Sequence, residues 1–169
     1  MGLFDKLFGK KETAPHVDTV KGGLYAPVTG TYIALEEIAD GVFSKGILGP
    51  GCGFEPEDER VVAPCNGTVT TVAETRHAVG LLSEDGAELL IHIGMDTVEM
   101  RGDGFSVKVK EGDKVVCGQT LLTFSTAKIK AAGHPVTSAF IVTNADEVGE
   151  LHLETGKRYE KTEKFGQIG

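Results

Sequence analysis

Short apolar runs separated by glycine-rich turns follow one another through most of the chain. Such runs, rich in Val, Ile, Leu and Thr and bounded by Gly, Pro, Asn or Asp, are typical of β-strands joined by tight turns, and their regular spacing favours a sandwich or barrel. One short helix is expected to begin after a Ser125 cap and to end before Gly133. The expected strands cover residues 24–28, 31–35, 61–63, 68–73, 79–82, 88–93, 106–109, 115–116, 120–124 and 139–142. The pattern therefore predicts an all-β chain with little helix.

One of these strand–turn–strand patterns occurs twice. Residues 25–32 read Tyr-Ala-Pro-Val-Thr-Gly-Thr-Tyr, and residues 62–69 read Val-Ala-Pro-Cys-Asn-Gly-Thr-Val. Both copies consist of a strand, an Ala-Pro turn, a Gly-Thr pair and a second strand. A duplicated β unit explains the repeat economically, and two similar but unrelated turns are the alternative.

The first residues of the chain have a different character. The segment 1–11 is amphipathic, because its apolar residues fall on one helical face and its lysines give it a basic character on an acidic protein. Such a segment favours peripheral contact with an anionic membrane surface. A frayed tail and a helix docked on its own domain are the alternatives. We therefore divide the chain into an N-terminal segment and linker, residues 1–21, and one domain, residues 22–169.

Composition narrows the classes of function. The 169 residues include 23 glycines, which agrees with many tight turns, and the formal net charge is −8. Nucleic acid, whose phosphates carry the same sign, is thereby excluded as an expected partner. The three cysteines form no C-x-x-C pair, no apolar stretch is long enough to span a membrane, and no signal peptide is recognisable. We expect a cytoplasmic protein with reduced thiols.

Two histidines carry the strongest chemical signal. His77 lies at the start of a short apolar run, and His92 interrupts the apolar run 89–93. If these runs form neighbouring strands, both imidazoles can face a single ligand. Imidazole is the side chain best suited to accept a proton, a metal or a phosphoryl group near neutral pH.

Five motifs in fixed order then resemble the glucose-type IIA component of the bacterial sugar phosphotransferase system. They are Ala-Pro-Cys-Asn-Gly-Thr-Val at 63–69, Glu-Thr-Arg-His-Ala at 74–78, Glu-Leu-Leu-Ile-His-Ile-Gly-Met-Asp-Thr-Val at 88–98, Gly-Asp-Gly-Phe at 102–105 and Val-Lys-Glu-Gly-Asp-Lys-Val at 109–115. The resemblance covers roughly residues 22–145. It implies a duplicated antiparallel β-sandwich or barrel and a phosphotransferase component that needs no obligatory cofactor.

The resemblance also implies roles for individual residues. His92 would take a phosphoryl group from phospho-HPr and pass it to a cysteine of a IIB domain, with His77 as its partner histidine and Thr75 beside it. Asp96 matches the aspartate of the family's active site, although a simple turn residue is the alternative. Phe43 lies in a segment that resembles one lending an exposed aromatic side chain to partner binding, and a core phenylalanine is the alternative. Regulated permeases and kinases are further partners that the resemblance suggests.

The chemistry of the residues agrees with these roles. A neutral imidazole nitrogen is a good nucleophile toward phosphorus, provided that a hydrogen bond fixes the tautomer. The backbone carbonyl of Gly94 is a candidate for that bond, and the hydroxyl of Thr75 is a candidate to orient an imidazole. We expect Arg76 to lie outside the site, because neighbouring strand residues point to opposite faces.

Three alternatives compete with this interpretation. A zinc peptidase of related β fold needs an H-x-H pair, but Leu90 and Gly94 stand two residues on either side of His92. A biotinyl or lipoyl carrier would use Lys128, but its neighbours Ala127 and Ile129 do not match that motif. A regulator that only binds partners is the third. A zinc ion held by His77 and His92 at a partner interface is a further expectation.

Overall fold

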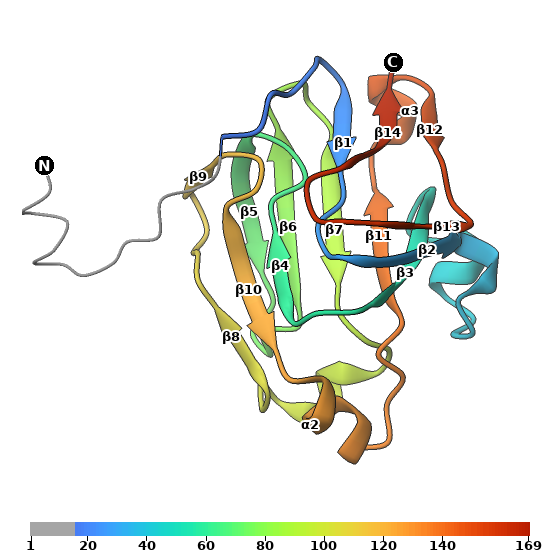
Figure 1. Cartoon of the computed structure of the whole chain (residues 1–169), viewed down its shortest axis with the longest axis vertical. Helices are drawn as coiled ribbons and strands as arrows, with labels where there is room; N and C mark the ends of the chain where they lie inside the picture. The colour runs from blue at the N-terminus through green and yellow to red at the C-terminus, as the bar shows by residue number, and fades with distance from the viewer. Residues whose placement is uncertain (1–15) are drawn as a thin grey trace, which may run out of the picture.

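An eight-stranded antiparallel sheet forms the larger layer of the computed structural model, which describes residues 16–169 (Figure 1). Two three-stranded antiparallel sheets lie against it within this range. The large sheet has the order β13 (Lys157–Tyr159), β2 (Gly30–Ala34), β3 (Gly51–Pro56), β11 (Ser138–Val142), β7 (Glu88–His92), β6 (Ala78–Ser83), β5 (Gly67–Val72) and β9 (Lys114–Val115). The small sheets are β1 (Gly23–Tyr25), β14 (Lys164–Ile168) and β12 (Leu151–Leu153), and β4 (Arg60–Val62), β10 (Thr120–Phe124) and β8 (Phe105–Val107).

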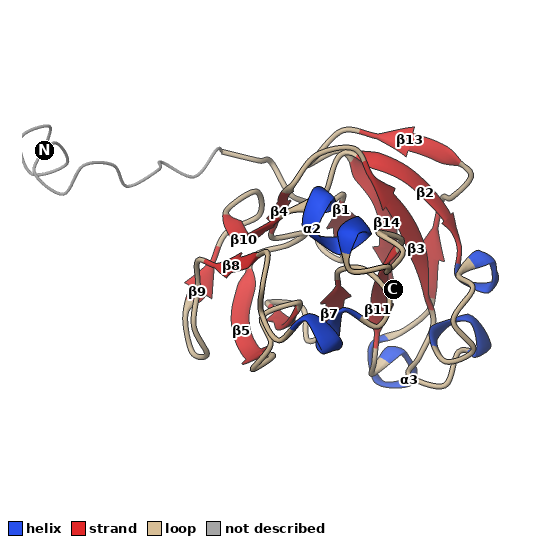
Figure 2. Ribbon diagram, turned by 90° about the horizontal axis from the view of Figure 1, so that it is seen from below, coloured by secondary structure: helices blue, strands red, loops and turns tan. Residues whose placement is uncertain are grey.

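The architecture confirms the predicted all-β fold. The sheets do not close into a barrel in the described part of the chain, so the sandwich is the correct one of the two predicted architectures. Helical segments are short and lie at the ends of the sheets (Figure 2). They are η1 (Leu35–Glu37), η2 (Phe43–Lys45), η3 (Thr97–Met100), α2 (Thr126–Ala131) and α3 (Ala145–Val148).

Alternation along the central strands explains how the sheet has a core face and an outer face. In β7, Leu89 and Ile91 are buried in the main core, whereas Leu90 and His92 are only half-buried on the opposite face. Successive side chains of a strand point to opposite faces, so His92 shares its face with Leu90. The core face is filled by aromatic rings, among which Tyr32 and Phe165 lie 5.0 Å apart between ring centroids.

Each of the ten expected strands overlaps an observed one, and the expected helix is also present. α2 follows Ser125, whose side-chain oxygen accepts the backbone N–H of Lys128 at 3.2 Å. The sequence pattern missed β3, β12, β13 and β14. In β3 the glycines at 51 and 53 look like turn residues, but an added Cβ at Gly51 would collide with the carbonyl oxygen of Phe140 on β11. There the glycine is required by close approach of two strands.

The repeated sequence forms two turns that hydrogen-bond to each other. The N–H of Tyr25 donates to the carbonyl of Pro64 at 3.0 Å, and the N–H of Val62 donates to the carbonyl of Pro27 at 2.8 Å. The two bonds are equivalent under exchange of the copies, because Tyr25 corresponds to Val62 and Pro27 to Pro64.

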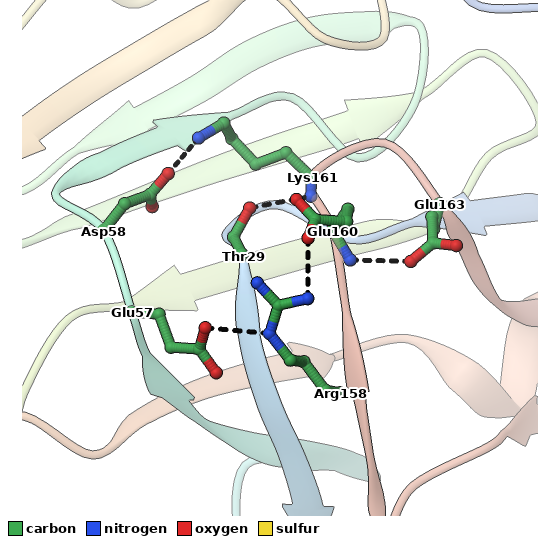
Figure 3. Close-up of polar contacts among 7 residues, drawn as sticks. All are labelled: Thr29, Glu57, Asp58, Arg158, Glu160, Lys161 and Glu163. Atoms are coloured by element: carbon green, nitrogen blue, oxygen red, sulfur yellow. Dashed lines mark hydrogen bonds and ion pairs between the residues drawn. The ribbon is translucent and has the colours of Figure 1, made fainter.

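The equivalence extends to more distant segments. The N–H of Lys161 donates to the side chain of Thr29 at 3.0 Å (Figure 3). In the second copy the N–H of Cys117 donates to the side chain of Asn66, which corresponds to Thr29, at 2.8 Å. Bonds repeated between non-adjacent segments are not expected of two unrelated turns, so the duplicated unit is the correct interpretation.

The N-terminal segment 1–11 lies outside the described residues, so its predicted membrane contact stays a prediction. No helix within residues 16–169 is both long and apolar enough to cross a membrane. Cys52, Cys65 and Cys117 are buried free thiols, as expected for reduced cysteines.

Candidate functional site

His77 and His92 lie side by side at one end of the central strands. His77 immediately precedes β6, and the register of the sheet places Ala78 opposite His92 on β7. The N–H of Ile93 also donates to the carbonyl of His77 at 2.9 Å. The two imidazole rings are 4.7 Å apart between centroids and nearly perpendicular, at 83°. The predicted pairing of the two histidines is therefore present.

A backbone carbonyl fixes the tautomer of His92. Nδ1 of His92 lies 2.9 Å from the carbonyl oxygen of Gly94. A carbonyl only accepts, so Nδ1 must carry the proton and donate it. Nε2 then keeps its lone pair. The predicted hydrogen bond to Gly94 is thus in place, and the free nitrogen is the one on the far side of the ring.

Gly94 is required at this position by its backbone conformation. Its φ is +74°, in the region that L side chains rarely adopt. A Cβ there would lie 2.5 Å from Cγ2 of Thr97 and 3.2 Å from the carbonyl oxygen of Pro135. Another residue would move the carbonyl that bonds His92.

His77 is held by Thr75. Oγ1 of Thr75 lies 2.8 Å from Nδ1 of His77, in the turn that joins β5 to β6. His77 is only 7 % exposed. Because Nδ1 is occupied, Nε2 is the nitrogen that His77 has left to offer a ligand.

Burial keeps both imidazoles uncharged at neutral pH. Loss of water contact, with a smaller contribution from the neighbouring His77, lowers the pKa of His92 to about 4. The Gly94 bond and the carboxylates of Asp40 and Asp96 raise it, but burial wins. The pKa of His77 is also lowered, and burial is again the cause. A neutral imidazole is the nucleophilic form.

Phe43 is not the exposed aromatic side chain that its segment suggested. It is 7 % exposed and packs in a small apolar cluster with Ile38, Met95 and Ile141. Its ring lies 5.0 Å from the His92 ring between centroids, at 61°. The alternative, a core phenylalanine, is correct, and this one contacts the candidate nucleophile. The exposed apolar residues nearby in the chain are Val42, Ile47 and Leu48.

The carboxylates of Asp40 and Asp96, one before and one after His92 in the chain, both influence the charge of its ring. Asp96 is exposed and adopts a left-handed backbone conformation, with φ of +61°, just before η3. Asp40 accepts the N–H groups of Phe43 at 2.8 Å and Ser44 at 3.1 Å. Although partial burial opposes it, these N–H groups lower the pKa of Asp40. Asp96 thus lies in a turn and its charge reaches His92, and its match to the family's active-site aspartate stays a prediction.

The strand alternation that was expected to place Arg76 outside the site does not apply to it, so its place there stays a prediction. It lies in the turn between β5 and β6, not on a strand, and has φ of +61°. An added Cβ at Gly102 would lie 3.7 Å from its Cδ, so its side chain runs toward that loop. Val79 is fully buried in the core, whereas Leu90 is half-buried on the outer face that it shares with His92.

The comparison with protein families decides what this site belongs to. Residues 23–148 match the family of the phosphoenolpyruvate-dependent sugar phosphotransferase system described as EIIA 1. The match includes both histidines and their hydrogen-bond partners. The chain belongs to this family. It is therefore a phosphotransferase component, a phosphocarrier in sugar uptake, as the motifs predicted.

Named relatives agree with this assignment. The glucose-specific EIIA component of Staphylococcus epidermidis is 43 % identical over 153 residues, which cover 90 % of this chain and 89 % of the relative. The beta-glucoside-specific EIIBCA component of Bacillus subtilis is 49 % identical over 124 residues. These cover 73 % of this chain but only 20 % of the relative, so this chain matches a fifth of that protein.

A solved structure shares the fold. The glucose permease IIA from Mycoplasma capricolum superposes with a TM-score of 0.77 at 30 % identity, over 85 % of this chain and 93 % of the other. The family match supports neither the zinc peptidase nor the biotinyl or lipoyl carrier. Lys128 lies on α2 and pairs with Asp103 at 2.8 Å. Within residues 16–169, no group of three or more His, Cys, Asp or Glu side chains is placed to hold a metal ion.

Proposed function

We propose that Nε2 of His92 accepts a phosphoryl group from phospho-HPr and passes it to a cysteine of a IIB domain. The observation that carries the proposal is the Nδ1 bond to Gly94, which leaves Nε2 with a lone pair. In the first transfer the bond between phosphorus and its carrier atom on HPr breaks while the bond from phosphorus to Nε2 forms. In the second, the Nε2–phosphorus bond breaks while a sulfur–phosphorus bond forms on the partner.

His77 supports the transfer by donating to the phosphoryl group. If the Thr75 hydroxyl donates to Nδ1 of His77, then Nε2 of His77 carries a proton. That N–H is available to phosphoryl oxygens bound at His92, whose ring is 4.7 Å away between centroids. Phosphoryl transfer depends mainly on positioning and charge stabilisation, which such a donor supplies. Thr75 then acts by orienting His77.

The surface around the pair suits a basic partner. Val42, Ile47 and Leu48 from the η2 segment and Val98 from η3 are exposed. Asp40, Asp96 and Glu99 belong to the same two segments. Exposed apolar residues together with carboxylates favour docking of a partner that offers apolar and basic residues, and we assign HPr and the IIB domain to this face, which residues 40–48 and 96–99 define. The Bacillus subtilis relative, an EIIBCA component whose name joins B and A parts, supports the IIB assignment.

Three further assignments belong to this proposal. We place the protein in the cytoplasm, with residues 1–11 in peripheral contact with the inner membrane surface and residues 22–169 as the phosphocarrier domain. Regulated permeases and kinases would bind the same face. A zinc ion could be held at such an interface by His77 and His92 only if a partner supplies the remaining ligands, since the pair offers two nitrogens.

The test is to map phosphate on the protein. The chain is incubated with phosphoenolpyruvate, enzyme I and HPr, and acid-labile phosphate is located by mass spectrometry. We expect phosphate on His92 and none on a His92→Ala variant. Unmodified protein in the presence of active phospho-HPr would overturn the proposal.

A second variant tests the role of His77. His77→Gln keeps the His92 nucleophile but replaces the ring that faces the phosphoryl group. We expect this variant to accept phosphate and to pass it on about a hundredfold more slowly than the wild type, because removal of one transition-state donor has effects of that order. The measurement is the rate of phosphate loss to a IIB domain. Onward transfer at the wild-type rate would contradict the role given to His77.

A further inference from the structure

Ser138 is a fully buried polar residue that contacts the site only through Gly94. It begins β11 and is 0 % exposed. Its Oγ accepts the N–H of Gly94 at 3.0 Å and donates to the carbonyl of Val136 at 2.8 Å. The hydroxyl is thus used both as an acceptor and as a donor. A buried strand position has no need of a hydroxyl for packing, so its presence calls for a different reason.

The segment that precedes Ser138 holds the adjoining peptide unit. The carbonyl of Gly94, which bonds Nδ1 of His92, shares a peptide unit with the N–H of Met95. That N–H donates to the carbonyl of Pro135 at 3.1 Å. Pro135 and Ser138 therefore fix the two peptide units on either side of the Gly94 α-carbon.

A third bond restrains the same turn from the other end. The hydroxyl of Thr97 donates to the carbonyl of Ile93 at 2.6 Å. This carbonyl belongs to the peptide unit whose N–H bonds Ser138. The unit between Ile93 and Gly94 is thus held at both its oxygen and its nitrogen. Without such restraints, the freedom of a glycine with positive φ would allow the carbonyl to turn away from His92.

We propose that Ser138 is a positioning residue for phosphoryl transfer, acting through Gly94 on the orientation and tautomer of His92. The inference rests on the proposed role of His92 as the phosphoryl acceptor. It extends that role across the sheet, because β11 pairs directly with β7 and places Ala139 opposite His92. Ser138 on β11 thus supports the nucleophile through the backbone of Gly94 and not by a bond to the His92 ring itself.

The proposal predicts a defined effect of Ser138→Ala. The N–H of Gly94 loses its acceptor, the Gly94 carbonyl is less firmly held, and the Nδ1-protonated form of His92 is less populated. We expect the turnover rate of phosphoryl transfer to fall about tenfold, since small displacements of a reacting group cost up to about a hundredfold. The KM for phospho-HPr should change by less than about twofold, because the docking surface is untouched.

Two further variants separate positioning from stability. Ser138→Thr keeps the hydroxyl and suits a strand, so it should restore the rate. Ser83→Ala is the matched control, because Ser83 is also buried and its Oγ accepts the N–H of Ala87 at 3.0 Å in a turn at the end of β6 remote from His92. It should lower stability without altering the turnover rate or the His92 tautomer.

The measurements are ¹⁵N NMR of the His92 ring, which reports the tautomer without any phosphoryl donor, and steady-state transfer from phospho-HPr. A mixed tautomer together with reduced turnover in Ser138→Ala, rescued in Ser138→Thr, would support the proposal. A wild-type spectrum and rate in Ser138→Ala would overturn it. If Ser138→Ala does not fold, Ser138→Cys, a weak acceptor of similar size, replaces it with the same criteria. Wild-type protein that takes no phosphate would instead overturn the proposed function, and the role of Ser138 in transfer with it.

Discussion

The reactivity of His92 depends on two separate properties, its charge and its tautomer. Burial decides the first, since it lowers the pKa to about 4 against the opposing effect of Asp40 and Asp96. The Gly94 carbonyl decides the second by taking the Nδ1 proton. Burial alone would keep the ring neutral but would not decide whether Nδ1 or Nε2 carries its single proton. The Gly94 carbonyl alone would decide the tautomer but would leave the ring partly cationic near pH 6. Together they give a neutral ring with an unprotonated Nε2 throughout the physiological range.

A titration of His92 tests the first property. We expect its NMR signals to stay unchanged from pH 8 to about pH 5.5 and to shift only near pH 4, whereas an ordinary histidine titrates near 6.5. The His92 ring in denaturant-unfolded protein, where water surrounds it, is the control. A His92 midpoint near 6.5 would contradict the effect of burial.

The same shift makes stability depend on pH. The unfolded chain binds a proton at His92 more readily than the folded one, because the folded pKa is the lower of the two. The contribution of neutral His92 is therefore complete above about pH 6.5 and is lost as the pH falls toward 4, by up to about 3 kcal/mol. Denaturant unfolding of wild type and His92→Gln at pH 7.5 and 4.5 measures it. Between pH 7.5 and 4.5 the wild type should lose more of its free energy of unfolding than the variant does.

At the scale of elements, the duplicated turns depend on two equivalent glycines. Gly30 opens β2 and Gly67 opens β5. An added Cβ would collide with a backbone carbonyl of the neighbouring strand in both copies, that of Glu55 or that of Leu82. Neither glycine has a positive φ, so the requirement is one of space alone.

We therefore expect Gly30→Ala and Gly67→Ala to destabilise the fold to a similar extent, by about 2 kcal/mol each. Gly80→Ala on the adjacent strand is the control, because its Cβ would meet the side chain of Thr70 at 3.1 Å, whereas the backbone oxygen of Leu89 lies at an ordinary contact distance of 3.7 Å. Denaturant unfolding checks the prediction. Equal effects at Gly67 and Gly80 would show that the backbone collision is not the cause.

Elements with alternating apolar residues were predictable from the sequence, and those shaped by close approach were not. β7 and α2 carry their signals locally, in the alternation of residues 88–92 and in the Ser125 cap. β3 has glycines where a strand normally has side chains, because a Cβ at Gly51 would meet the backbone of β11 and one at Gly53 would meet the side chain of Ile38. The His77 and His92 pair was predictable for the same local reason, since strand pairing follows from the order of apolar runs. Ser138 was not, because its link to His92 passes only through backbone atoms of the Gly94 turn.

At the scale of the whole molecule, a half-buried ion pair ties the C-terminal part of the chain to the connection between β3 and β4 (Figure 3). Nζ of Lys161, whose side chain is 17 % exposed, pairs with Oδ2 of Asp58. Oδ1 of Asp58 is buried and has no hydrogen-bond partner among the described residues. Asp58 thus depends on Lys161 alone for its side-chain contacts in that part of the chain.

Lys161→Met should accordingly destabilise the protein by about 2 kcal/mol, because it leaves a partly buried carboxylate without its partner. Arg158→Met is the matched control on the neighbouring strand. Arg158 is 50 % exposed and pairs with Glu57 and Glu160, and exposed pairs contribute little. Thermal unfolding of both variants compares them. A larger loss in Arg158→Met would contradict the importance of burial here.

Phosphorylation changes the charge of the proposed docking face as a unit. Phosphate on His92 would add about two negative charges to this face, beside the Phe43 ring that contacts His92, on a chain whose net charge is already −8. A partner that binds the neutral histidine pair through apolar contact would then have to desolvate that charge.

We therefore expect partners to distinguish the phosphorylated from the unphosphorylated protein. The dissociation constants of unphosphorylated HPr for the two forms should differ by at least about tenfold. Calorimetry at low and high salt measures the difference, which should shrink at high salt because the charge is screened. Equal affinity of both forms for every partner at low salt would show that the phosphate lies outside the docking face.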